Sequence, residues 1–177
     1  MRTLVLGGIR SGKSRWAENL IGVDGAVRYI ATGHPDLSDV TWTNRIATHR
    51  DRRSPNWETV ESCDVAIELR SAPSTPTLVD DVGGWLVSAF ARRGWNHGSP
   101  EPDIDELVCA VEDFAGPLVL ISPEVGMTVV PASESGRLFA DELGATNQRL
   151  AQCCDQAVLI VAGLPTWLKQ TNTGTTS

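Results

Sequence analysis

The octapeptide at residues 7–14, GGIRSGKS, constrains this chain more than any other feature. It follows an apolar run, TLVL, and precedes a segment in which apolar side chains recur at helical spacing, with Trp16 four residues before Leu20. A glycine-rich loop between a strand and a helix points backbone N–H groups at phosphate oxygens. In such loops the lysine reaches the β- and γ-phosphates, and the serine hydroxyl can ligate Mg²⁺. The sequence therefore predicts a P-loop that binds a nucleoside triphosphate through Gly7, Gly8, Ile9, Arg10, Ser11, Gly12, Lys13 and Ser14, with Lys13 also catalytic and Ser14 a metal ligand.

Short apolar runs alternate with longer helical patterns along the rest of the chain. We predict strands at residues 3–6, 27–31, 77–79, 118–121 and 158–161, and helices at 14–21, 41–52, 84–93, 103–114 and 133–154. The runs are continuously apolar, as in strands that are covered on both faces. This order predicts an α/β protein with a mainly parallel sheet and helices on both faces. With 177 residues, we expect one domain over residues 1–169 and a disordered polar tail over 170–177.

Two adjacent aspartates follow the predicted strand at residues 77–79. A P-loop protein needs a carboxylate to complete the Mg²⁺ shell, and Asp80 is favoured because it directly ends the apolar run. Capping of the next helix is the alternative interpretation of Asp80 and Asp81. The DDVG tetrapeptide also matches the D-x-x-G of switch GTPases, but the N-K-x-D tetrapeptide that reads guanine is absent from the sequence. A nucleotide-consuming transferase is therefore favoured over a signalling GTPase.

Composition excludes several other classes of protein. Lys and Arg number 15 against 22 Asp and Glu, a net charge of −7, which argues against a nucleic-acid partner. No run approaches the roughly 18–20 apolar residues of a membrane span, and the N-terminal apolar run is too short for a signal peptide. The four cysteines and three histidines show no zinc spacing. We expect a cytoplasmic protein without a membrane span.

The segment at residues 45–53, RIATHRDRR, places His49 among four arginines. Like charge disfavours the imidazolium, which leaves a neutral and nucleophilic ring. The same arginines can neutralise phosphate oxygens around it. The alternative is a solvated helix face on which the histidine has no chemical role, and the segment alone does not decide between them.

The order of motifs resembles one family, the bifunctional adenosylcobinamide kinase / adenosylcobinamide-phosphate guanylyltransferases of cobalamin biosynthesis. The resemblance extends from Leu4 to Lys169. It rests on residues 7–14 (GGIRSGKS), 29–32 (YIAT), 45–46 (RI) with 49–50 (HR), 124–126 (EVG), 130–131 (VP), 147–148 (NQ) and 161–165 (VAGLP). Departures from the family pattern occur at Pro123, Thr128 and Ala140, which affect expected substrate loops but not the P-loop or His49.

The resemblance implies a RecA-like P-loop NTPase fold, a homo-oligomer and two reactions. The first is phosphorylation of adenosylcobinamide, a corrinoid, with ATP or GTP. The second is transfer of GMP from GTP, by way of a GMP–histidine intermediate on His49, to give adenosylcobinamide-GDP and pyrophosphate. It also implies Mg²⁺ as cofactor, held by Ser14 and Asp80, and nucleotide contacts from Ala31, Thr32, Gly33, Arg50, Asp51, Arg52, Arg53, Glu61 and Asp80.

Two alternatives remain open from the sequence. Glu61 can pair with the N1–H and exocyclic amine of guanine, or it can be an exposed carboxylate at a strand end. The whole chain can also be a P-loop kinase of another small hydroxylated molecule, without nucleotidyl transfer.

Overall fold

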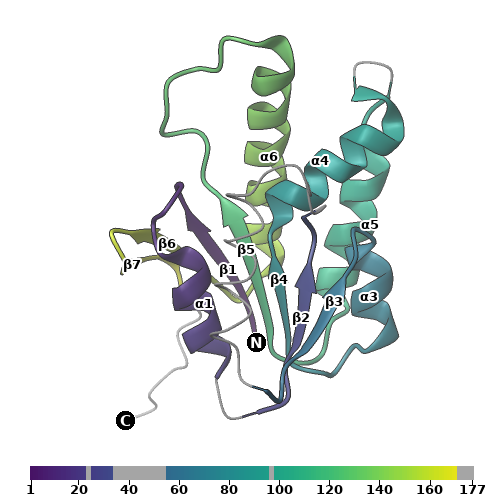
Figure 1. Ribbon diagram of the computed structural model, residues 1–177, viewed down its shortest axis with the longest axis vertical. Coiled ribbons are helices and arrows are strands. Elements are labelled where there is room, and N and C mark those ends of the chain that lie inside the picture. Colours follow the sequence, from purple (N-terminus) through teal and green to yellow (C-terminus); the bar gives the residue numbers. More distant parts are fainter. Residues whose placement is uncertain (23–24, 34–54, 96–97, 171–177) are drawn as a thin grey trace.

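A computed structural model describes residues 1–22, 25–33, 55–95 and 98–170 (Figure 1). These residues form a seven-stranded sheet in the order β3-β2-β4-β5-β1-β6-β7. The strands are β1 (Arg2–Gly7), β2 (Arg28–Ala31), β3 (Glu58–Glu61), β4 (Thr77–Asp80), β5 (Leu118–Pro123), β6 (Gln156–Val161) and β7 (Leu164–Lys169). All neighbouring pairs are parallel except β6 and β7, which form an antiparallel hairpin. The predicted mainly parallel sheet is confirmed.

Strand β1 lies inside the sheet, between β5 and β6. Its Leu4 and Val5 have no exposed surface, because both faces of the sheet are covered there. β5 also separates β1 from β4, the strand that ends at Asp80. One strand between the P-loop strand and the strand of the acidic residue is the order of RecA-like P-loop proteins. The fold is therefore the α/β P-loop fold that the sequence predicted.

Helices cover both faces of the sheet, as predicted, but unevenly (Figure 1). Helix α1 (Lys13–Ile21) packs through Ala17 and Leu20 on one face, against Val5 and Ile121. The opposite face carries α3 (Val65–Ser71), α4 (Val82–Arg93), α5 (Glu101–Glu112) and α6 (Glu134–Cys153). None of the helices in the described parts of the chain is long and apolar enough to cross a bilayer. The predicted helix at residues 41–52 and residues 171–177 of the tail lie outside the described residues.

Three elements were not predicted. β3 has the sequence ETVE, whose two glutamates break the apolar run that identified the other strands. It pairs only with β2 among the described strands, so it lies at a sheet edge, where charged side chains are tolerated. Every residue of β7 lies at the surface, and the strand contains Pro165, which also suits an edge strand. Helix α3 has only 7 residues, too few for a helical period to stand out.

Lys169 joins the last strand to the end of the longest helix. Its Nζ donates to the carbonyl oxygens of Ala151, Gln152 and Cys154, at 3.0, 3.0 and 2.6 Å. These carbonyls lie at the C-terminus of α6, where helix carbonyls have no helical partner and carry partial negative charge. A cation there satisfies them and fixes the free end of the hairpin.

Substitution of a core leucine tests this packing. Leu120, in the middle of β5, has no exposed surface. Leu120→Ala should lower the free energy of unfolding by about 2–5 kcal/mol, because it leaves a cavity between the sheet and its helices. Ile67→Ala on α3, where the side chain is 60% exposed, should cost less than about 1 kcal/mol. Denaturant unfolding of both variants measures the difference, and equal losses would contradict the assigned core.

Candidate active site

The P-loop leaves the carboxyl end of β1 and returns into α1. Gly12 adopts φ +91°, and Arg10 also has positive φ at +58°, so the loop makes a tight turn. The Ser11 N–H donates to the Gly8 carbonyl at 3.2 Å, which closes the turn. The Lys13 ammonium lies 3.5 Å from the same carbonyl, and Ser14 lies in the first turn of α1. Ile9, at the outer bend, is 89% exposed. The tight turn, the Lys13 ammonium and the N-terminus of α1 are thus arranged as in a site that binds a triphosphate.

Parallel strands bring the other predicted nucleotide contacts to the same edge of the sheet. Ala31 ends β2 and lies in register with both Glu61 of β3 and Asp80 of β4. Thr32 and Gly33 directly follow β2; Thr32 is fully buried. Ligands of open α/β sheets bind at this carboxyl edge. The structure therefore brings Ala31, Thr32, Gly33, Glu61 and Asp80 to the edge from which the P-loop also emerges.

The two adjacent aspartates are held differently. The phenol of Tyr29, a buried residue of β2, donates to Asp80 Oδ2 at 2.6 Å and fixes that carboxylate. Asp81 caps α4, because its Oδ1 accepts from the Gly84 N–H at 2.7 Å. Its backbone is bonded twice to Thr32: the Asp81 N–H donates to Thr32 Oγ1 at 3.0 Å, and that hydroxyl donates to the Asp81 carbonyl at 2.6 Å. Capping, one of the two alternatives for this pair, is therefore the role of Asp81.

The pKa of Asp81 is raised from its ordinary value of 3.8 to about 6, chiefly by burial and also by the neighbouring Asp80 carboxylate. The Gly84 N–H and the Lys13 ammonium lower this pKa and so limit the rise. The influence of Lys13 shows that the P-loop lysine and the acidic end of β4 share one electrostatic environment.

Ser14 and Asp80 fit a Mg²⁺ ion bound together with nucleotide. No group of three or more His, Cys, Asp or Glu side chains that could hold a metal occurs within the described ranges. Mg²⁺ is typically bound by one or two carboxylates together with substrate phosphates, rather than by an all-protein cage. A serine hydroxyl at the start of α1 and a carboxylate oriented by Tyr29 suit that mode.

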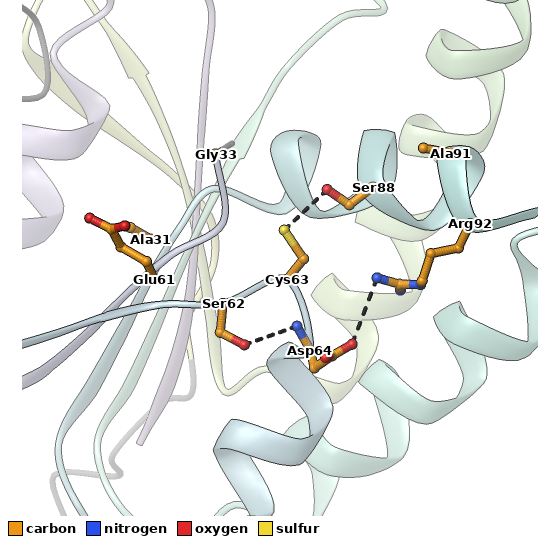
Figure 2. A pocket seen from close by; sticks show the side chains of 9 residues that line it. All are labelled: Ala31, Gly33, Glu61, Ser62, Cys63, Asp64, Ser88, Ala91 and Arg92. Atoms are coloured by element: carbon orange, nitrogen blue, oxygen red, sulfur yellow. Dashed lines mark hydrogen bonds and ion pairs between the residues drawn. The ribbon is translucent and has the colours of Figure 1, made fainter. Parts of the chain in front are cut away.

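A cavity of about 730 Å³ lies beside the ends of β2 and β3 (Figure 2). Its lining includes Glu61, whose carboxylate extends away from two side-chain pairs that form another part of the wall. In one pair, the Ser88 hydroxyl donates to Cys63 Sγ at 3.1 Å. In the other, Arg92 Nη1 forms an ion pair with Asp64 Oδ1 at 3.7 Å. The full lining is Ala31, Gly33, Glu61, Ser62, Cys63, Asp64, Ser88, Ala91 and Arg92. Ala31, Gly33 and Glu61 were predicted from the sequence, and the other six were not. Ser62, Cys63 and Asp64 follow β3, which was itself not predicted, and the three α4 residues reach the cavity only through folding.

The turn between β6 and β7 supports the P-loop from outside. The Gly163 N–H donates to the Ser11 carbonyl at 2.8 Å. A Cβ atom on Gly12 would lie 3.2 Å from Gly163 Cα, so the two backbones approach closely. Trp167 of β7 also packs edge-on against Trp16 of α1, with ring centroids 5.7 Å apart. The turn of the VAGLP motif, at residues 161–165, is thus in direct contact with the P-loop.

The remaining predicted site residues cannot be placed. His49, Arg50, Asp51, Arg52 and Arg53 lie outside the described residues. Their roles stay predictions from the sequence and the resemblance.

The comparison with protein families identifies the chain's family. Residues 3–168 match the model of the cobinamide kinase / cobinamide phosphate guanyltransferase family. The chain belongs to this family. The kinase and guanyltransferase activities of the family require a nucleotide site, and the P-loop at the carboxyl edge has the geometry of one.

Relatives from two bacteria match over nearly their whole length. The bifunctional adenosylcobalamin biosynthesis protein CobP of Pseudomonas aeruginosa is 39% identical over 96% of this chain and 98% of its own. The bifunctional adenosylcobalamin biosynthesis protein CobU of Salmonella typhimurium is 36% identical over 96% of this chain and 100% of its own. Among solved structures, the P4 protein of bacteriophage phi6 in complex with ADP is similar at a TM-score of 0.47 and 13% identity, over 98% of this chain and 55% of that chain.

The raised pKa of Asp81 predicts a pH dependence of stability. Below its ordinary pKa of 3.8 the group is protonated whether the chain is folded or not. As the pH rises to about 6 only the unfolded chain releases the proton, so this group's contribution to stability falls, by at most roughly 3 kcal/mol. Asp81→Asn keeps an oxygen for the Gly84 N–H and cannot ionise. As the pH rises from 4 to 7, the free energy of unfolding of Asp81→Asn should increase relative to that of the unmodified protein. If the two free energies changed in parallel with pH, the raised pKa of Asp81 would be contradicted.

The Gly163 turn predicts a loss of nucleotide affinity that is separable from stability. Gly163 has φ +80°, and Gly94, the C-cap of α4, has φ +72°. Alanine at either position should therefore cost about 1 kcal/mol of stability, because both backbones have positive φ. Only Gly163→Ala should displace the N–H that holds Ser11, and it should weaken GTP binding about tenfold. Calorimetric titration of both variants checks this; equal affinities would show that the turn does not position the loop.

Proposed function

We propose that this chain phosphorylates the aminopropanol hydroxyl of adenosylcobinamide with a nucleoside triphosphate and then transfers GMP from GTP to the new phosphate. The products are adenosylcobinamide-GDP and pyrophosphate. The match of residues 3–168 to a family defined by both activities carries this proposal. The P-loop and the acidic end of β4 support it, because both reactions consume a triphosphate. The same match does not favour a kinase of another small alcohol.

In the kinase step, the chain's task is to hold the triphosphate and neutralise its charge. The P-loop N–H groups and the N-terminus of α1 surround the β- and γ-phosphates, and Lys13 exchanges its contact with the Gly8 carbonyl for phosphate oxygens. Ser14 and Asp80 would hold Mg²⁺, which offsets negative charge on the phosphates when bound. The acceptor hydroxyl attacks the γ-phosphorus, and the bond to the β-phosphate oxygen breaks.

In the guanylyl step, His49 is proposed as the nucleophile. A neutral imidazole nitrogen attacks the α-phosphorus of GTP, and the bond to the leaving pyrophosphate breaks. A phosphate oxygen of adenosylcobinamide phosphate then attacks the same phosphorus, which releases the histidine and forms the new pyrophosphate linkage. Arg50, Arg52 and Arg53, neighbours of His49 in the sequence, would stabilise the charge that develops on the phosphoryl oxygens, with Asp51 a further nucleotide contact.

The cavity at the ends of β2 and β3 is a candidate base pocket for GTP. The carboxylate of Glu61 can accept from the two adjacent donors of guanine, which adenine lacks in that arrangement. The wall at Ala31 and Gly33 carries only a methyl group and a hydrogen atom, which leaves room for a planar base. An exposed strand-end carboxylate without a ligand remains the alternative for Glu61.

Further parts of the proposal have other grounds. A homo-oligomeric assembly rests on the resemblance alone, whereas a cytoplasmic location and a single catalytic domain over residues 1–169 rest on composition and length. A requirement for Mg²⁺ rests on the P-loop, with Ser14 and Asp80 as the proposed ligands.

Labelling with GTP that carries its label on the α-phosphate tests the proposed intermediate. Incubation with Mg²⁺ should attach GMP to the protein through a bond that is labile in acid and stable in base, as expected of a phosphoramidate. His49→Ala should abolish the label and retain cobinamide phosphorylation, because the histidine takes no part in γ-phosphoryl transfer.

Lys13→Ala serves as the comparison, since both reactions need the triphosphate, and it should lower both rates by at least about a hundredfold. A labelled His49→Ala protein, or loss of both activities in a folded His49→Ala protein, would contradict the division of roles.

A further inference from the structure

Arg10, at the bend of the P-loop, adopts a backbone conformation that suits glycine better than arginine. Its φ is +58°, in the left-handed region, where a residue with a Cβ atom is strained. The residue is exposed, and its guanidinium makes no hydrogen bond or ion pair with the residues that the structure describes. Strained backbone that persists at a particular residue is concentrated at functional sites, so the side chain of Arg10 needs an explanation.

Two other residues with side chains have positive φ in the described ranges, and each has a structural reason for it. Trp95, at φ +54°, stacks on Phe90 with ring centroids 4.9 Å apart, so that packing offsets the strain. Ala162, at φ +51°, lies in the two-residue turn between β6 and β7, where hairpin geometry favours positive φ. Arg10 is exposed and lies in no hairpin, so neither reason applies to it.

Most arginines in the described part of the chain already have a partner. Each donates to a carboxylate or to a backbone carbonyl oxygen. They are Arg2, Arg28, Arg70, Arg92, Arg93, Arg137 and Arg149. Arg15 is exposed on the first turn of α1 without such a partner, but its backbone is helical and unstrained. Arg10 alone among the described arginines combines an unpaired guanidinium with a strained backbone.

The kinase step needs more positive charge than Lys13 supplies. The Lys13 ammonium already interacts with the Asp81 carboxyl group, which adjoins Asp80, so carboxylates offset part of its charge. Lysine is also a point charge, whereas a guanidinium carries a planar fork of donors that matches phosphate oxygens. In the proposed guanylyl step, other arginines act at the α-phosphorus. A second cation at the γ-phosphate is therefore missing from the site, and Arg10 belongs to the loop that surrounds that phosphate.

We propose that Arg10 is a catalytic residue of the kinase step, whose guanidinium binds the γ-phosphate and stabilises the charge that develops during its transfer. The inference rests on the proposed function, in which a hydroxyl attacks the γ-phosphorus. No bond to Arg10 forms or breaks. While the bond between the γ-phosphorus and the β-phosphate oxygen breaks, the N–H groups of Arg10 donate to the γ-phosphoryl oxygens. The left-handed backbone is then the consequence of carrying arginine at this bend.

Substitutions that relieve the strain separate the side chain from the backbone. Glycine and asparagine adopt positive φ more readily than arginine, so neither Arg10→Gly nor Arg10→Asn should lower the denaturant midpoint. Arg15→Ala is the matched control, because it removes the same charge from an exposed position at the start of α1.

Two measurements are compared in these proteins. The first is the pair of dissociation constants for GTP and GDP, obtained by calorimetry with no Mg²⁺ or corrinoid added, so that neither reaction proceeds. The second is kcat for phosphorylation of adenosylcobinamide. Both Arg10 variants should lose about tenfold in their preference for GTP over GDP and at least about a hundredfold in kcat, whereas Arg15→Ala changes neither.

An unchanged preference for GTP, or an unchanged kcat, in either Arg10 variant would overturn the proposal. Equal losses in Arg15→Ala would also overturn it, because the effect would then belong to net charge and not to a contact of Arg10. Failure of the proposed function is a separate result: the unmodified protein phosphorylates no cobinamide, although the Arg10 variants still lose their preference for GTP.

Discussion

The parallel pairing of β1 with strands on both sides is the constraint on which the site depends. Because β1 is hydrogen-bonded to β5 and to β6, its backbone has no freedom to shift, and the chain must leave the sheet at Gly7. Parallel register then brings the ends of β2, β3 and β4 to the same edge, with Ala31, Glu61 and Asp80 at equivalent positions. The P-loop, the carboxylate of Asp80 and the cavity beside Glu61 thus lie at one edge of the sheet through main-chain pairing.

The edge of the sheet is chemically divided. Toward β4 it is polar: Tyr29 orients Asp80, and Asp81 shares its surroundings with Lys13. The segment after β5 instead exposes the apolar side chains of Met127, Val129 and Val130, and its Glu124 carboxylate accepts from the N–H groups of Gly126 and Met127.

The sequence was sufficient for the features that depend on local signals. The GGIRSGKS loop, five of the seven described strands and four described helices follow from glycine placement, apolar runs and helical period. β3 and β7 were not predicted, because exposed edge strands need no apolar run. Among site residues, Tyr29 could not have been singled out as the partner of Asp80, since that contact depends on which strands are neighbours. The same holds for Ser88 and Arg92, which reach the cavity from α4. Sequence reasoning identifies residues with intrinsic chemistry and cannot find those that act through tertiary position.

The contact of Gly163 with Ser11 has a consequence for the order of events in folding. The P-loop is translated early, but the turn that holds its carbonyl is made only after five helices and six strands of the described chain have been translated. Contacts between such distant residues form late, because the entropy of closing a long loop must be overcome first. A nascent chain therefore carries the phosphate-binding sequence long before it carries a supported phosphate-binding site. Nucleotide binding becomes a property of the finished molecule, acquired when its C-terminal hairpin docks and Lys169 reaches the end of α6.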